Sequence, residues 1–200
     1  LGVDYVDYYW LHGLNAQTYR QAEEMHAFDF IQTKKTEGKI HHIGLSFHDK
    51  AILLDEILTA HPELEYVQIQ LNYLDWNDPA VESRLCYEVA VKHHKPVIVM
   101  EPVKGGSLVQ IPDLSKELFE KVHPDLSVAS WAIRFAASPS HVMMVLSGMS
   151  DEQQVADNIS YMKDFQPLDE KEQQVVDQAV KIIHASEVIP CTACRYCTDT

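Results

Sequence analysis

Five short apolar runs recur along the chain, each followed by a turn signal and then by a helical period. Their positions are 5–11 (YVDYYWL), 40–46 (IHHIGLS), 66–72 (YVQIQLN), 96–102 (PVIVMEP) and 141–147 (HVMMVLS). The runs are nearly continuous in apolar character, as are the strands of a parallel sheet that is buried on both faces. Strand and helix therefore alternate five times, which predicts an α/β fold.

The segments between the strands carry apolar residues every three or four positions, which predicts helices. The first helix is expected from about Gln17 to Lys35, with Gly38 ending it, and Asp49 is the expected N-cap of the second. A long loop, 103–114, is expected after the fourth strand. The apolar faces expected of the later helices are Leu54, Ile57 and Leu58; Val81, Leu85 and Val89; Val128, Ala129, Trp131, Ala132 and Ile133; Val155, Ile159 and Met162; and Val176, Ala179, Val180 and Ile183.

Two α/β architectures fit this alternation, an open doubly wound sheet and a (β/α)8 barrel. An open nucleotide-binding sheet usually carries G-x-G-x-x-G after its first strand, and the seven glycines never take that spacing. Polar residues instead end nearly every strand, where barrels assemble their active sites. They are His12, Ser46, Asn72, Glu101 and Ser147. The pattern favours the barrel.

A barrel of this type needs about 250 residues, and the five units here occupy about the first 165. Three units are therefore expected upstream of Leu1. The barrel part is expected over 1–185, with its last helix on the outside. Residues 186–200 are expected to be a linker and the start of a small cysteine-rich domain.

Composition narrows the classes of partner. The chain has 200 residues, 46% of them hydrophobic, and a formal net charge of −14 that is scattered along the helical segments. Such a surface disfavours nucleic acid and anionic membranes as partners. No apolar run approaches the roughly 20 residues that a membrane span needs. The chain is therefore predicted to be soluble.

The cysteines are distributed unevenly, since three of four fall in the last ten residues. Cys191, Cys194 and Cys197 form C-x2-C-x2-C, the first part of the ferredoxin run C-x2-C-x2-C-x3-C-P, whose fourth cysteine would fall at position 201. Metal or iron–sulfur ligation is thus favoured over disulfides, which predicts a reducing, cytoplasmic setting. Zinc is the rival ligand. The fourth cysteine, Cys86, is expected to be a buried small hydrophobe.

The strand ends resemble those of the aldo/keto reductases. DYVDYYWLHG is similar to that family's fourth barrel strand, IHHIGLSFHD to the fifth, YVQIQLNYLD to the sixth and PVIVMEPVKGG to the seventh. VLSGMSDEQQVADN resembles the eighth strand and the helix after it. Together with MEPVKGG, the cysteine tail resembles the iron–sulfur branch of the family. The resemblance implies a (β/α)8 barrel that transfers hydride between a nicotinamide cofactor, NAD(P)H, and a carbonyl or alcohol, with a 4Fe-4S cluster.

The resemblance also assigns site residues. It implies that His12 is catalytic, while the family's tyrosine, lysine and aspartate match no residue shown. Ser46 and Gln68 match positions that hold the nicotinamide carboxamide, and Met100 stands where many members stack a tyrosine on the ring. Phe47 and His48 depart from the family pattern, in which asparagine and an aromatic residue are common.

The cofactor's phosphates and adenosine are assigned to two later segments. In Glu101, Pro102, Lys104, Gly105 and Gly106, the two glycines are expected to admit a phosphate to the backbone, with Lys104 offsetting the charge of Glu101. The adenosine contacts implied are Gly148, Gln154, Asp157 and Asn158. Gln154 and Gly148 stand where members that bind the 2′-phosphate of NADP often carry arginine and lysine, so NADH is expected to serve at least as well as NADPH.

Three functions stay open at this point. The first is an oxidoreductase acting on a small carbonyl or alcohol, coupled through its cluster to a redox partner protein. The second is a catalytically silent barrel that binds the cofactor and reports redox state as a sensor or regulatory subunit. The third, a pure electron-transfer module, leaves so large a barrel without a purpose.

Overall fold

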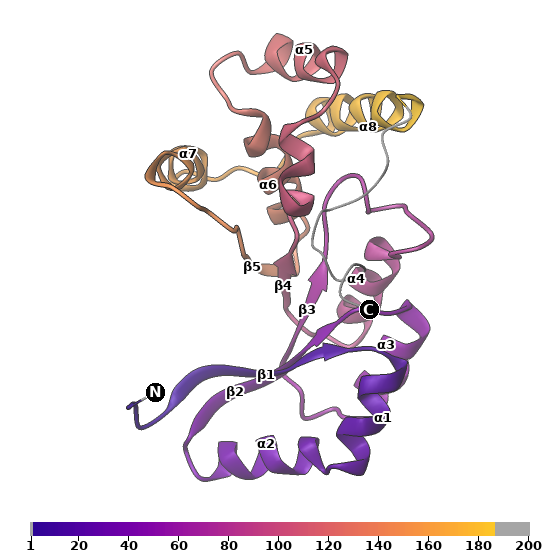
Figure 1. The fold of residues 1–200 in the computed structure, drawn as a ribbon, viewed down its shortest axis with the longest axis vertical. Helices are drawn as coiled ribbons and strands as arrows, with labels where there is room; N and C mark the ends of the chain where they lie inside the picture. Colours follow the sequence, from indigo (N-terminus) through magenta and orange to yellow (C-terminus); the bar gives the residue numbers. More distant parts are fainter. Residues whose placement is uncertain (1, 187–200) are drawn as a thin grey trace. The chain divides into compact units, whose positions relative to one another are not determined.

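Each of the five apolar runs overlaps a strand in the computed structural model of the chain, which describes residues 2–186 (Figure 1). The strands are β1 (Val6–Leu14), β2 (Ile40–Phe47), β3 (Tyr66–Gln70), β4 (Val97–Met100) and β5 (Val142–Val145). The described residues divide into two compact units. The first contains 2–70 and Asp75–Val99, and the second contains Leu71–Leu74 and 100–186.

The sheet of the first unit places β1, β2, β3 and β4 side by side in chain order. The pairings β1–β2 and β2–β3 are both parallel, and the second aligns Ser46 with Gln68. The N–H of Val67 donates to the carbonyl of Pro96 at 3.1 Å, which connects β3 to the start of β4. The predicted α/β fold with a parallel sheet is confirmed.

The first unit has four helices: α1 (Ala16–Glu24), α2 (Ala27–Thr36), α3 (Ala51–Ala60) and α4 (Ser83–Lys92). One continuous helix was expected where α1 and α2 lie. The prediction is wrong because His26 adopts a left-handed backbone (φ 55°), which ends the first helix and starts the second (Figure 1). The new direction lets α2 pack on β2 through Phe28 and Ile31.

Asp49 does not cap α3, contrary to the prediction. The N-cap is Lys50, and the two oxygens of the Asp49 carboxylate accept hydrogen bonds from the N–H groups of Lys50 and Ala16, each at 2.8 Å. A distant carboxylate fills the role instead, because the N–H of Ala51 donates to Oε2 of Glu82 at 3.0 Å. The expected buried residues Leu54, Ile57 and Leu58 are confirmed.

The buried face of α4 differs from the expected one. Val81 precedes the helix and Leu85 is 40% exposed, whereas Ser83, Cys86 and Ala90 are buried. The helix therefore turns its small side chains inward. The four-residue repeat of larger apolar residues predicted the wrong buried face. The separate prediction that Cys86 is buried is confirmed, since it is 3% exposed.

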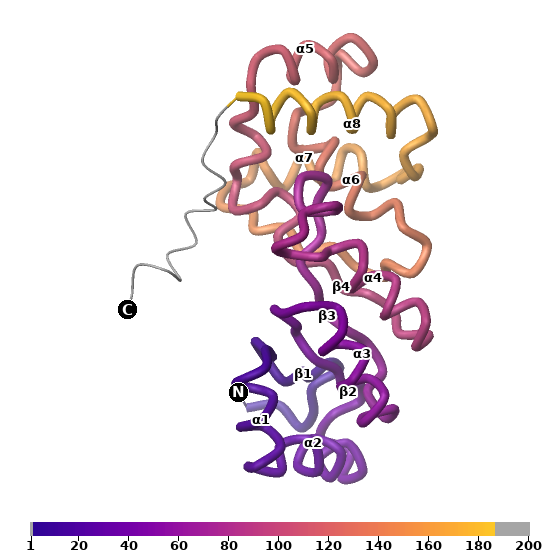
Figure 2. The backbone as a smooth tube through the Cα atoms, turned by 90° about the vertical axis from the view of Figure 1, so that its right-hand side faces the viewer, coloured from indigo at the N-terminus to yellow at the C-terminus, as the bar shows by residue number. Residues whose placement is uncertain are grey.

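The second unit contains a 3₁₀ segment, η1 (Lys104–Val109), and four helices beside β5. The helices are α5 (Asp113–Val122), α6 (Val128–Ala137), α7 (Glu152–Met162) and α8 (Glu170–Ala185). A loop was expected over 103–114, and α5 was not predicted. Figure 2 shows α5 beside α8, against which it packs.

The core of the second unit is aromatic. Trp131 of α6 is fully buried and stacks on Phe119 of α5, with ring centroids 4.4 Å apart. Tyr73 meets Phe119 and Phe135 edge to face. On α8 the expected Val176, Ala179 and Ile183 are buried. On α7, however, the expected Val155 and Ile159 are exposed, and Tyr161 is the buried residue.

Candidate functional site

A pocket of about 620 Å³ lies in the second unit, between the turn that joins β4 to η1, the start of α6, the β5–α7 loop and α7. Much of its lining consists of residues that the sequence assigned to a cofactor. They are Glu101, Pro102, Gly105, Gly106, Gly148, Gln154, Asp157 and Asn158. Segments far apart in the chain thus meet around one cavity. Met100 and Lys104 are not part of its lining, and Lys104 is buried, with 6% exposed.

The turn after β4 has an unusual backbone. Glu101 and Lys104 adopt left-handed φ angles of 56° and 50°, a conformation that is costly for residues with side chains and that concentrates at functional sites. The carbonyl of Glu101 accepts hydrogen bonds from Nδ2 of the buried Asn72 at 3.0 Å and from the N–H of Lys104 at 3.1 Å. These contacts hold the turn in its strained form.

The two glycines of this turn continue the left-handed backbone, with φ 60° at Gly105 and 88° at Gly106. Glycine adopts such angles without steric cost. A Cβ added to Gly106 would meet no atom within 4 Å, so its requirement for glycine is conformational. The N–H of Gly106 donates to the carbonyl of Val103 at 3.0 Å and is therefore used within the turn.

On the opposite wall, the first turn of α7 holds Gln154. Asp151 caps the helix by accepting from the N–H of Gln154 at 2.9 Å. The Gln154 amide donates to Asp151 at 3.0 Å and accepts from the N–H of Ser150 at 2.8 Å. The side chain of Gln154, at the expected 2′-phosphate position, is thus hydrogen-bonded to the start of its own helix and the loop before it.

Asp157 and Asn158 are held by separate partners. Ser127, the N-cap of α6, donates its hydroxyl to Oδ2 of Asp157 at 2.6 Å, which links α6 to α7. Asn158 donates from Nδ2 to Oγ of Ser147 at 3.0 Å, and its Oδ1 accepts from the hydroxyl of Tyr161. Ser127 and Tyr161 were not among the predicted site residues. Ser127 stands before an apolar helical run, a position typical of an N-cap, and Tyr161 lies one helical turn after Asn158.

The charge of the pocket is negative. Within residues 2–186, its lining includes the carboxylates of Glu101 and Asp157 but no Lys, Arg or His. Oε2 of Glu101 is buried and has no hydrogen-bond partner among the described residues. The pocket therefore offers neutral side chains, backbone groups and apolar walls to a ligand, with one carboxylate oxygen free to accept a hydrogen bond.

The remaining predicted residues lie in the first unit. Ser46 is fully buried, and its Oγ accepts the N–H of Gly13 at 3.4 Å and lies 3.3 Å from Nε2 of His48. The exposed His12 faces His48 with ring centroids 6.4 Å apart. Burial, and to a smaller degree His12, lowers the pKa of His48. A neutral His48 ring can accept a hydrogen bond from the hydroxyl of Ser46.

Gln68 lies beside Ser46 in the sheet register and is 7% exposed. Its Oε1 is buried and has no partner among the described residues. Buried polar atoms are nearly always hydrogen-bonded, so this oxygen is an acceptor that a donor group of a ligand could satisfy. An amide N–H, such as that of a nicotinamide carboxamide, has the required chemistry.

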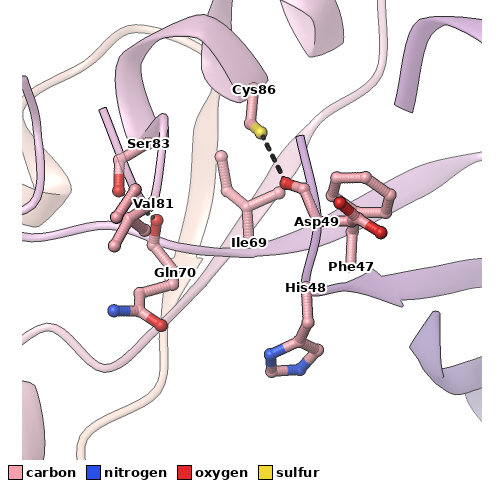
Figure 3. Close-up of a pocket in the computed structure, with 9 residues that line it drawn as sticks. Phe47, His48, Asp49, Ile69, Gln70, Val81, Ser83 and Cys86 are labelled. Carbon is pink, nitrogen blue, oxygen red and sulfur yellow. Dashed lines mark hydrogen bonds between the residues drawn. The ribbon is translucent and has the colours of Figure 1, made fainter. Parts of the chain in front are cut away.

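A smaller pocket of about 180 Å³ lies in the same unit, beside His48, Asp49, Gln70 and Cys86 (Figure 3). The Cys86 thiol points at the carbonyl of Asp49, with 3.8 Å between sulfur and oxygen. Burial, and then Glu82, raise the pKa of this thiol to about 12. Because the thiolate is the reactive form, Cys86 is an inert packing residue.

Neither a metal centre nor a membrane span is found in the part of the chain that the structure describes. No group of three or more His, Cys, Asp or Glu side chains within residues 2–186 is arranged to hold a metal ion. None of the helices described there has the length and apolarity to cross a bilayer. The predicted cluster ligands Cys191, Cys194 and Cys197 lie outside the described residues.

Comparison with known proteins gives a family match. The profile described as "Aldo/keto reductase family" matches residues 1–181. A search of the curated proteins finds no match.

Several solved structures share the fold. The aldo-keto reductase AKR11C1 from Bacillus halodurans, in its holo form, superposes with a TM-score of 0.68 at 22% identity, over 88% of this chain and 61% of that one. An aldo/keto reductase from Klebsiella pneumoniae, in complex with NADP and acetate, gives 0.64 at 18% identity over 88% and 59%. One from Brucella melitensis gives 0.66 at 19% identity over 89% and 62%. The chain thus spans about three fifths of the length of these proteins, and the predicted barrel fold class is confirmed.

Proposed function

Because the chain belongs to the aldo/keto reductase family, we propose that the protein binds a nicotinamide dinucleotide and catalyses hydride transfer between it and a small carbonyl or alcohol. The observation that carries this proposal is the 620 Å³ pocket of the second unit, which gathers four separate segments around the residues expected to touch the cofactor. A cavity of this size falls within the range usual for small-molecule and cofactor sites.

In this proposal each part of the dinucleotide is assigned to the residues that the family resemblance matches to it. Asp157 and Asn158 bind the adenine, and the turn carrying Gly105 and Gly106 receives the phosphates. Ser46 and Gln68 orient the nicotinamide carboxamide, supported by the unpartnered Oε1 of Gln68. When bound, the cofactor supplies the hydride. His12 is proposed to donate a hydrogen bond to the substrate oxygen as negative charge develops there.

The proposal includes a preference for cofactor. Selection of NADP over NAD requires cations at the 2′-phosphate. Gly148 and Gln154 line the pocket, and the described lining includes no Lys, Arg or His. NADH is therefore proposed to bind at least as well as NADPH. An NADPH affinity more than about a hundredfold higher than that for NADH, equivalent to about 2.7 kcal/mol, would contradict this.

An iron–sulfur cluster is a further part of the proposal, supported by sequence spacing alone. Cys191, Cys194 and Cys197 are proposed as ligands of a 4Fe-4S cluster that exchanges electrons with a redox partner protein. Anaerobic reconstitution with iron and sulfide should give visible absorbance that is lost in the Cys194→Ser variant. Retention of zinc in place of iron after purification without added metal would identify the rival zinc site.

The first test is binding of NADH and NADPH to the full-length protein, followed by quenching of tryptophan fluorescence under anaerobic conditions. Gly148 lines the pocket and a Cβ there meets no atom within 4 Å, so Gly148→Leu should fill the cavity without disturbing the fold. We expect saturable quenching in the wild type and at least tenfold weaker binding in Gly148→Leu, about 1.4 kcal/mol. Ser140→Leu, at an exposed position of the same unit, is the matched control.

If neither cofactor binds the wild type, the reductase proposal fails. Oxidation of NADH in the presence of carbonyl substrates then separates two remaining cases. Turnover identifies the enzyme, whereas binding without turnover of a panel of aldehydes and ketones favours the silent, cofactor-sensing barrel.

A further inference from the structure

Tyr161 is the buried residue of α7, and the reaction proposed above gives it no role. It is 8% exposed, and its hydroxyl donates to Oδ1 of Asn158, one helical turn earlier. Asn158 lines the large pocket, whereas Tyr161 does not. The phenol therefore contacts the wall of the pocket from behind.

The second contact of the Asn158 amide lies on the β5–α7 loop. Nδ2 of Asn158 donates to Oγ of Ser147 at 3.0 Å, and Ser147 also lines the pocket. A primary amide has two N–H donors and two carbonyl lone pairs. Since Ser147 takes one donor and Tyr161 one lone pair, one N–H and one lone pair remain for a ligand.

The direction in which this amide faces depends on Tyr161. The Ser147 hydroxyl can either donate or accept, so it tolerates both orientations of the amide. If the amide were reversed, the Tyr161 hydroxyl would face Nδ2 and its buried proton would lose its acceptor, which is unfavourable. Burial, and then Asp157, raise the pKa of Tyr161, so the phenol keeps that proton through the physiological range.

We infer that Tyr161 is a positioning residue that fixes the Asn158 amide so that the pocket reads the 6-amino group of a purine. An amide with one N–H and one carbonyl lone pair matches adenine, which presents the N6 amino donor beside the N7 acceptor. Hypoxanthine carries an oxygen acceptor at position 6, which would face the carbonyl oxygen of Asn158. This inference rests on the proposed dinucleotide-binding function.

The test compares NADH with its analogue in which hypoxanthine replaces adenine, titrated into the full-length protein and its variants. We expect the wild type to bind NADH about tenfold or more tightly than the analogue. Tyr161→Phe keeps the ring and removes the hydroxyl. It should weaken NADH binding by about threefold to tenfold and reduce the ratio of the two dissociation constants at least threefold.

Two further variants separate positioning from general packing. Tyr73→Phe is the matched control, because Tyr73 is also buried in the second unit and its hydroxyl has no partner among the described residues. It should leave both constants unchanged. In an Asn158→Ala background, Tyr161→Phe should have no further effect on the ratio, because Tyr161 acts through that amide.

The outcomes are distinct. Absence of binding of either dinucleotide to the wild type overturns the proposed function together with this inference. If the wild type binds NADH selectively and Tyr161→Phe keeps the same selectivity, or weakens both ligands equally, the positioning role alone is wrong. Loss of selectivity in Tyr161→Phe, with Tyr73→Phe unchanged, establishes it.

Discussion

Glu172 is the residue whose replacement should most weaken the second unit. It belongs to α8, is 5% exposed, and accepts hydrogen bonds from the guanidinium of Arg134 at 2.7 Å and from Nε2 of His123 at 2.8 Å. Its other oxygen accepts the N–H of Asp169 at 2.9 Å, which completes the capping box of α8. One carboxylate thus connects α8 with α6 and with the end of α5.

The cost of Glu172→Gln follows from the burial of its partners. Arg134 is 8% exposed and remains charged. Its Nη1 already has no hydrogen-bond partner among the described residues. Removing one member of a buried ion pair costs about 3–5 kcal/mol, because the other charge stays buried and uncompensated. Glu170→Gln, at an exposed site in the same helical turn, should cost no more than about 1 kcal/mol.

The assay is the free energy of unfolding from urea titration, measured as a function of pH. Burial by itself raises the pKa of Glu172, but the Asp169 N–H, Arg134 and His123 together outweigh it and lower the pKa. A group whose folded pKa is lowered stabilises the protein above its unfolded pKa, and this contribution is lost as the pH falls through the folded value. The difference between wild type and Glu172→Gln should therefore shrink below about pH 4.

Two results would refute this reasoning. One is a loss below about 1 kcal/mol for Glu172→Gln at pH 7, equal to that of the exposed control. The other is a loss that does not change as the solution is acidified. The double variant Arg134→Met/Glu172→Leu supplies a further check, since replacing both charges with apolar side chains should cost less than Glu172→Gln alone.

Three other predictions concern the sheet and the pocket. Gly44→Ala would place a Cβ 2.6 Å from the backbone oxygen of Tyr66 and should reduce the free energy of unfolding by about 3 kcal/mol, whereas Gly38→Ala, at φ 72° in open space, should cost about 1 kcal/mol. Gln154→Arg should raise the affinity for NADPH relative to NADH about tenfold in fluorescence titrations. An unchanged ratio of the two affinities would show that the 2′-phosphate does not bind beside residue 154. Raising salt from about 0.05 to 0.5 M should not weaken NADH binding, because no cation is found in the described lining, and a marked rise in the dissociation constant would reveal one.

The strands could be predicted from sequence because buried parallel strands are apolar at nearly every position. The helix faces were harder. The 83–92 helix turns the small side chains of Cys86 and Ala90 inward, whereas periodicity alone favours the larger Leu85. The break at His26 depends on a left-handed residue that carries no glycine signal. Helix α5 was missed because its buried residues, Ser115 and Phe119, are few and one of them is polar.

In the candidate site, too, some residues could be predicted from sequence and others could not. Residues at strand ends and on α7 could be assigned because the barrel topology and the family resemblance give them fixed places, and the structure gathers most of those in the second unit around one pocket. Their supporting partners were not predicted. Ser127 donates to Asp157 thirty residues later, a contact that depends on how two helices approach one another, which a single sequence does not encode locally. Tyr161 donates to Asn158 within one helix, at a spacing that the sequence did offer.

Asn72 illustrates how a strand-end residue can serve the site without facing a ligand. It was expected at the active face, but it is fully buried and holds the carbonyl of Glu101. The neighbouring residue secures the same turn, because the N–H of Leu71 donates to the carbonyl of Met100 at 3.1 Å. The left-handed backbone at Glu101 is unfavourable in isolation and persists only because this segment over-determines it. The strain of this turn is offset by folding, and a pocket wall fixed in this way loses little conformational entropy when a ligand binds. The rigid turn therefore contributes to affinity.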